Sequence, residues 1–204
     1  MLLNRECIVR HMLHLKSKYW IEGYALAMYS SSYNFIEGQS FTALGEAVHK
    51  FKYWKLLPQD RDRLQEFCVK SMHSALIDKF GTNPPFNFIV AVPANRKEGL
   101  SIPPLMSKDL AARSHGKLLD ATNSLTKLKE LPSMKNLSKD EKVEVLSDAY
   151  FFTDNLPKPI KGILILDDIF DSGTTLRFVA RAINLSYPDV PKYVMTLTAL
   201  RSNY

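Results

Sequence analysis

Apolar positions along the chain follow two spacings, and each spacing predicts its own kind of element. Apolar residues three or four positions apart predict helices over 6–20, 41–51 and 64–76. Runs that are apolar almost throughout, at 86–92 and 162–166, are typical of strands buried in a parallel sheet. Helices and strands therefore alternate along most of the chain.

Further elements complete this alternation. We expect strands at 23–33, 149–152 and 193–199, and helices at 104–115, 138–146 and 176–185. Ser138 and Glu141 have the spacing of a capping box, which marks the start of one of these helices. Segment 116–137 has no clear period and is predicted to be a long functional loop or a mobile flap.

This order of elements predicts an α/β fold. Strands that alternate with helices form right-handed βαβ units, so we expect a central, mainly parallel sheet flanked by helices. A ligand of such a sheet binds beyond the carboxyl ends of its strands. The length of 204 residues suits one domain with an appendage. We assign residues 1–22 to an amphipathic helical extension and 23–204 to the domain.

The charge and the cysteine content of the chain limit the kinds of partner, metal and cellular compartment that we expect. The 27 Lys and Arg residues against 21 Asp and Glu residues give a net charge of +6, which favours nucleotides, sugar phosphates or nucleic acid. Cys7 and Cys68 lie far apart and outside any metal-binding spacing, so we expect a cytoplasmic protein without protein-ligated zinc. Cys68 falls on a helical apolar stripe and is expected in the core. No apolar run reaches the length of a membrane span, and no membrane partner is expected.

Basic residues gather in two segments, 1–20 and 48–55, and the second interleaves lysines with aromatic residues. Such a run can bind single-stranded nucleic acid through stacking and phosphate contacts, or it can contact a partner protein. The same pattern arises when lysine stems cover the end of a helix, which is the commoner outcome. Both interpretations stay open at this point.

The most informative stretch follows the strand at 162–166 and reads LDDIFDSGTT from Leu166 to Thr175. Asp167 and Asp168 come at the end of the strand, where adjacent carboxylates suit a polyol or a metal-bound sugar. Asp171 precedes Ser172, Gly173, Thr174 and Thr175, whose hydroxyls and N–H groups would open a helix. A helix N-terminus favours a phosphate dianion, so carboxylates and cradle together suit a phosphorylated pentose.

This stretch resembles the phosphoribosyl pyrophosphate (PRPP) signature of the type I phosphoribosyltransferases, over about thirteen residues. The resemblance implies the fold of that family, with Asp167 and Asp168 on the ribose 2′ and 3′ hydroxyls. It implies a 5′-phosphate on Ser172, Gly173, Thr174 and Thr175, and Asp171 as an acid that exchanges a proton with the base. Mg²⁺ would be bound near Asp167 and Asp168, mainly through the substrate's own oxygens.

The residues that follow the earlier strand resemble the pyrophosphate loop of the same family. Ala94 and Asn95 would present backbone N–H groups, and Arg96 or Lys97 would stabilise the departing pyrophosphate. The wider layout resembles the ComF-like branch over about 23–199, without the four-cysteine zinc module that often begins such proteins. Segments 23–57 and 116–152 would then form a hood over the base.

The reaction that the resemblance implies is displacement of pyrophosphate from C1 of PRPP by a nitrogenous base, or its reverse. The chain would thus be a phosphoribosyltransferase of nucleotide metabolism whose acceptor base the sequence does not identify. The alternative is a non-catalytic PRPP or nucleotide sensor, or a nucleic-acid-associated regulator or effector in DNA uptake, processing or defence. Either protein is compatible with a homodimer.

Overall fold

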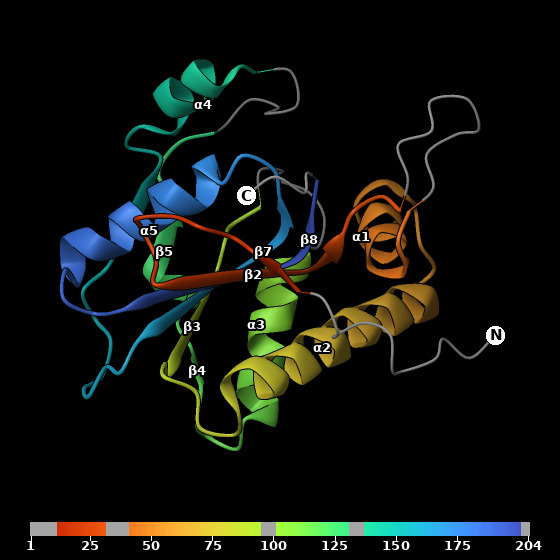
Figure 1. The fold of residues 1–204 in the computed structure, drawn as a ribbon, viewed down its shortest axis with the longest axis horizontal. Coiled ribbons are helices and arrows are strands. Elements are labelled where there is room, and N and C mark those ends of the chain that lie inside the picture. Colours follow the sequence, from red (N-terminus) through yellow and green to blue (C-terminus); the bar gives the residue numbers. More distant parts are fainter. Residues whose placement is uncertain (1–11, 32–40, 95–100, 131–136, 201–204) are drawn as a thin grey trace.

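A computed structural model describes residues 12–31, 41–94, 101–130 and 137–200 (Figure 1). Its elements, in chain order, are β1 (Leu13–His14), β2 (Glu22–Met28), α1 (Ala43–Tyr53), α2 (Pro58–Phe80), β3 (Phe88–Ala91), α3 (Ile102–Arg113), β4 (Leu119–Asp120), the 3₁₀ turn η1 (Thr122–Ser124), β5 (Leu125–Lys127), α4 (Lys139–Leu146), β6 (Tyr150–Phe152), β7 (Ile163–Phe170), α5 (Thr174–Ser186) and β8 (Lys192–Ala199).

The main sheet has the strand order β1-β2-β8-β7-β3-β4. Every pairing in it is parallel except that of β1 with β2. The strands β5 and β6 pair antiparallel in a separate small sheet. The prediction of an α/β fold with a mainly parallel sheet flanked by helices is confirmed.

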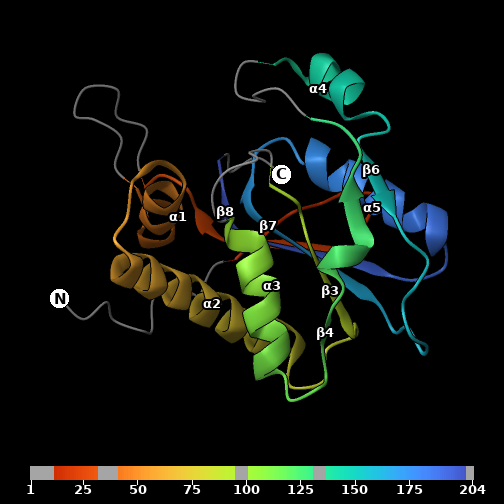
Figure 2. The same cartoon turned by 180° about the vertical axis from the view of Figure 1, so that it is seen from behind.

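Helices cover both faces of the sheet (Figures 1 and 2). The face under α1, α2 and α3 buries one apolar cluster, with Met72, Leu110 and Leu164 among its members. The opposite face packs against α4, α5 and the small sheet, and its cluster includes Leu146 and Ile165. The continuous apolar pattern of β7 follows from this arrangement, because a strand covered on both faces needs apolar residues on both.

The helix predicted over 6–20 is wrong in its described part. Leu13–His14 form a strand that pairs with β2, and the Leu15 N–H donates to the Gly23 carbonyl at 2.7 Å. Leu15 and Trp20 are buried in the apolar cluster that includes Leu146 and Ile165. Backbone pairing with β2 outweighs the local helical spacing of the apolar residues. Residues 6–11 lie outside the described residues, and the division of the chain at residue 22 stays a prediction.

The segment predicted to be a long loop or flap, 116–137, is ordered in its described part. Residues 119–127 form β4, η1 and β5, and Ser107 Oγ donates to the Asp120 carboxylate at 2.8 Å. Edge pairing with β3 and β6 organises a stretch that has no hydrophobic period of its own. Of the predicted hood segment 23–57, residues up to Met28 lie in β2 of the main sheet.

The topology marks one place on the sheet for a ligand. From β3 the chain passes through α3 to β4 on one side, whereas from β7 it passes through α5 to β8 on the other. The connections of β3 and β7 therefore diverge, and a crevice opens between the ends of such neighbours. Within the described residues, no helix has both the length and the apolar character to cross a membrane.

Candidate phosphate and sugar site

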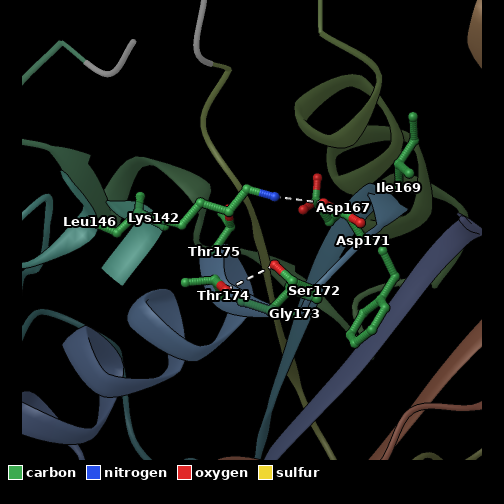
Figure 3. A pocket seen from close by; sticks show the side chains of 11 residues that line it. Lys142, Leu146, Asp167, Ile169, Asp171, Ser172, Gly173, Thr174 and Thr175 are labelled. Atoms are coloured by element: carbon green, nitrogen blue, oxygen red, sulfur yellow. Dashed lines mark hydrogen bonds and ion pairs between the residues drawn. The ribbon is translucent and has the colours of Figure 1, made fainter. Parts of the chain in front are cut away.

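A cavity of about 90 Å³ lies at the carboxyl end of β7, where α5 begins. Its walls are residues 169–176 together with Lys142, Leu146 and Asp167 (Figure 3). This volume suits a phosphate-sized group, because sites for whole small molecules usually measure about 300–1,000 Å³. A cavity of about 260 Å³ between the C-terminal ends of α2 and α3 has none of the predicted site residues in its walls.

The loop before α5 has the geometry of an anion cradle. Gly173 stands at the N-cap with φ +69°, a left-handed conformation that glycine adopts without strain. It has no side chain to cap the first N–H groups of α5, which leaves them available to an anion. The Ser172 and Thr174 hydroxyls lie 2.9 Å apart and hydrogen-bond to each other (Figure 3).

Asp167 faces this cavity from within β7. Burial, and after it the charge of Asp168, raises the pKa of its carboxyl to about 8, against a smaller opposing effect of Lys52. Its Oδ1 accepts a hydrogen bond from the Asp168 N–H at 2.9 Å. Nearby, the Tyr150 hydroxyl is buried without a hydrogen-bond partner in the described structure, and its pKa is raised by burial and by the charge of Asp167. The surroundings of Asp167 therefore favour the protonated, neutral form of its carboxyl group.

Asp168 is directed elsewhere. It is buried, and its Oδ1 lies 2.8 Å from Nζ of Lys52 on α1, the helix on the other face of the sheet. Burial lowers the pKa of Lys52, but the charge of Asp168 and its hydrogen bond outweigh that effect and raise it overall. The strand was expected to end at Leu166, yet β7 runs through both acids to Phe170 beside β8. Neighbouring residues of a strand point to opposite faces, so the acids separate.

Asp171 lines the same cavity and is paired with a lysine of α4. Its Oδ2 accepts a hydrogen bond from Nζ of Lys142 at 2.8 Å, and the Lys142 side chain is only 13% exposed (Figure 3). Lys142 comes from α4, where the predicted capping box of Ser138 and Glu141 is present. The two residues are 29 positions apart in the sequence and meet because α4 packs beside α5.

The predicted pyrophosphate loop is described only in part. Ala94 follows β3, and its carbonyl accepts a hydrogen bond from Nζ of Lys127 on β5 at 2.8 Å. Asn95, Arg96 and Lys97 lie outside the described residues. Their roles stay predictions.

The interleaved lysines and aromatic residues at the end of α1 divide between surface and interior. Tyr53 and Trp54 are 42% and 57% exposed, and Lys50 lies over the Trp54 ring at 5.1 Å. Lys52 instead points inward to Asp168. Binding of nucleic acid or of a partner protein here stays a prediction. Cys68 is fully buried, and burial raises the pKa of its thiol to about 12, which confirms its expected place in the core.

Sequence reasoning missed Lys52 and Lys142, the two cations that pair with motif carboxylates. Each lies on an element whose helical pattern was visible, but a helical pattern does not tell which distant residue its polar positions meet. Lys142 and Leu146 are four residues apart and both line the cavity, a spacing that places them on one face of α4. The spacing of Lys142 from Leu146 was therefore the one feature of the local sequence that could have indicated Lys142 as a residue of the site.

The raised pKa of Asp167 predicts a pH-dependent stability. An unfolded aspartate has a pKa of about 3.9, so between roughly pH 4 and pH 8 the folded protein holds a proton that the unfolded chain has lost. The free energy of unfolding should therefore fall with rising pH across this window, relative to Asp167→Asn. Urea unfolding at several pH values measures this difference. The exposed Asp62→Asn on α2 is the control, and equal pH profiles for wild type and Asp167→Asn would contradict the prediction.

A search of protein-family models finds no match for this chain, and neither does a search of curated proteins. Among solved structures, the chain is similar to a xanthine-guanine-hypoxanthine phosphoribosyltransferase of Helicobacter pylori. The TM-score is 0.43 and the sequence identity 15%, over 69% of this chain and 76% of that chain. A similarity of this extent says nothing about substrate, because one fold supports many functions.

Proposed function

We propose that this protein binds PRPP, or a nucleotide with a ribose 5-phosphate, and transfers the phosphoribosyl group between pyrophosphate and a nitrogenous base. One observation carries the proposal. The residues of the signature stretch from Asp167 to Thr175, Asp168 apart, line one cavity at the carboxyl end of β7. A carboxyl group and a phosphate cradle thus lie within the length of one sugar phosphate, beside the strand ends where ligands of parallel sheets bind.

The signature residues that line the cavity have tasks that their surroundings support. The hydroxyls of Ser172 and Thr174 and the first N–H groups of α5 would bind the 5′-phosphate. Asp167 would hold a ribose hydroxyl, and ligand groups or a cation would favour its ionised form. Asp171 would exchange a proton with the base. Arg96 or Lys97 would stabilise the pyrophosphate, as the sequence predicts.

The residues in the cavity also suit Mg²⁺. This ion takes oxygen ligands, typically one or two carboxylates with phosphates and water completing the set. Asp167 and Asp171 supply such oxygens to one cavity, whereas Asp168 is engaged by Lys52. Bound together with PRPP, the ion would neutralise charge on the leaving pyrophosphate. We therefore assign Asp167, rather than Asp168, to the metal and its substrate.

A second candidate function is binding without transfer, as in a sensor of PRPP or of a nucleotide. The observation that favours it is the ion pair of Lys52 with Asp168. This pair holds one of the two predicted ribose-binding acids away from the cavity. The ComF-like assignment belongs to the same proposal, because that layout is compatible with a regulatory protein as well as with an enzyme.

The decisive experiment measures binding and turnover separately. Calorimetry with PRPP and Mg²⁺ should show binding by the wild type and a loss of about tenfold or more in affinity for Asp167→Asn, since hydrogen bonds to charged groups are worth about 1.5–3 kcal/mol. Pyrophosphate release from PRPP with a panel of purine and pyrimidine bases tests the transfer. Asp62→Asn serves again as the charge-matched control.

The outcomes separate the candidates. Binding together with base-dependent pyrophosphate release supports the transferase, and binding without release from any base supports the sensor. If the wild type does not bind PRPP, or if Asp167→Asn binds it unchanged, the proposed site is wrong.

A further inference from the structure

The cavity at the end of β7 has an unfavourable charge for a phosphate unless a cation takes part. Two carboxyl groups, Asp167 and Asp171, line it. Of the described residues in its walls, Lys142 is the one cation. A phosphate dianion beside the carboxylate of Asp171 is repelled, and the repulsion grows when Asp167 ionises, whereas the first N–H groups of a helix contribute only about half a positive charge. Among the described residues, Lys142 therefore supplies the protein's own positive charge to a phosphate here, in addition to any Mg²⁺ that arrives with PRPP.

Lys142 is positioned to act within the cavity rather than in solvent. Its side chain is only 13% exposed, and Nζ donates to Asp171 Oδ2 at 2.8 Å (Figure 3). The next turn of α4 carries Leu146, which is buried in the core and also lines the cavity. The capping box of Ser138 and Glu141 supports the start of the helix. Lys142 is thus held in the cavity wall, beside Asp171, by a packed element.

Lys142 can exchange its ion pair with Asp171 for a contact with a ligand. An ammonium group has three donors and no fixed fork, so it can turn from one acceptor to another. The Asp171 side chain is 38% exposed and stays accessible to water and ligand when the ammonium group turns away. A phosphate at the N-terminus of α5 would compete with Asp171 for the same ammonium group.

We propose that Lys142 is the residue by which this site selects a 5′-phosphorylated ribose, and that it turns from Asp171 to the phosphate when the ligand binds. This inference rests on the proposed function for the identity of the sugar. It adds a binding residue outside the signature stretch, and it makes the pair of Lys142 and Asp171 a contact of the ligand-free site. The turn breaks the ion pair between Lys142 and Asp171 when the phosphate binds.

The test uses two substitutions that break the same ion pair from opposite sides. Lys142→Gln should lower the affinity for ribose 5-phosphate about tenfold or more, because it removes the cation that the phosphate needs. Asp171→Asn should leave that affinity equal or raise it, because it removes a competitor and a negative charge. Lys142→Arg should retain most of the binding. Calorimetry with the full chain measures ribose 5-phosphate against ribose, and exposed Lys161→Gln is the charge-matched control.

A loss of affinity in Lys142→Gln without a loss in Asp171→Asn supports the inference, since a pair with a purely structural role would weaken binding when broken from either side. The inference falls if Lys142→Gln distinguishes ribose 5-phosphate from ribose as well as the wild type does, or if Asp171→Asn also weakens binding. Thermal unfolding of each variant shows whether it is folded. If Lys142→Gln is not folded, Lys142→Arg takes its place in the comparison with the wild type. A wild type that binds ribose 5-phosphate but releases no pyrophosphate would refute only the transferase. One that binds ribose 5-phosphate no better than ribose would refute both.

Discussion

Replacement of Gly173 by alanine is expected to lower the affinity for PRPP or ribose 5-phosphate about tenfold to a hundredfold. Gly173 has φ +69°, a conformation that costs an L-residue about 1–2 kcal/mol. A Cβ at this position would lie 2.8 Å from Cζ of Phe170, so that ring or the loop must move. Because the ring belongs to the buried core, the loop is the part that yields, and the N–H groups of the cradle lose their alignment. Calorimetry measures the loss.

Gly116→Ala is the matched control for this substitution. Gly116 has φ +81°, and a Cβ there would meet no atom within 4 Å among the described residues. Both variants therefore carry the left-handed strain, but only Gly173→Ala disturbs the cradle. Gly116→Ala should lose about 1–2 kcal/mol of unfolding free energy and bind like the wild type, whereas Gly173→Ala should lose at least as much, because the clash with Phe170 adds to the strain. Unchanged ligand affinity in Gly173→Ala would show that phosphate does not bind at this loop.

Replacement of Lys52 by alanine is expected to cost about 2–3 kcal/mol of unfolding free energy. Removing one partner of a buried ion pair typically costs about 3–5 kcal/mol, because the other charge stays buried without compensation. Asp168 is 6% exposed, whereas the Lys52 side chain is 32% exposed, so we expect a cost at or somewhat below the lower end of that range. Urea unfolding at pH 7 measures the loss. The double variant Lys52→Met with Asp168→Asn should recover part of it, since neither charge remains.

The stability that Lys52 contributes should also depend on pH. The native pKa of Lys52 is raised, so its contribution is complete below the unfolded value of about 10.4 and is lost as pH rises through the native value. The difference between wild type and Lys52→Ala should shrink at high pH. Lys50→Ala on the same helix, whose carboxylate partner Glu46 is 54% exposed, should cost at most about 0.5 kcal/mol. A cost of that size for Lys52→Ala would exclude the buried pair.

Local patterns were sufficient for most of the elements. The continuous apolar run at 162–166 becomes the buried part of β7, and the predicted capping box of Ser138 and Glu141 opens α4. The helix predicted over 64–76 is the interior of α2, and Gly81 follows its end with φ +70° as a C-terminal glycine does. Signals of this kind succeed because backbone conformation and burial of one face are decided within a few neighbouring residues.

The candidate site shows where such reasoning ends. The stretch from Asp167 to Thr175 was recognised from its residue types, since a carboxyl pair, a glycine and hydroxyls in that order suit a sugar phosphate. Its charges, however, meet partners from other elements. Lys52 lies 116 positions from Asp168, and Lys142 lies 29 positions from Asp171. A hydrophobic period repeats every two to four residues, so it carries no information about contacts between residues this far apart.

The sequence by itself determined that helices and strands alternate around a parallel sheet, and it predicted a phosphate and sugar site from the residue types between Asp167 and Thr175. Only the tertiary structure decided the strand pairing at Leu13–His14, the extension of β7 beside β8 as far as Phe170, and the opposite directions of Asp167 and Asp168. The physical reason is the same in each case. Backbone pairing between distant strands and ion pairs between distant helices depend on where whole elements pack, and packing is set by the entire core rather than by neighbouring residues.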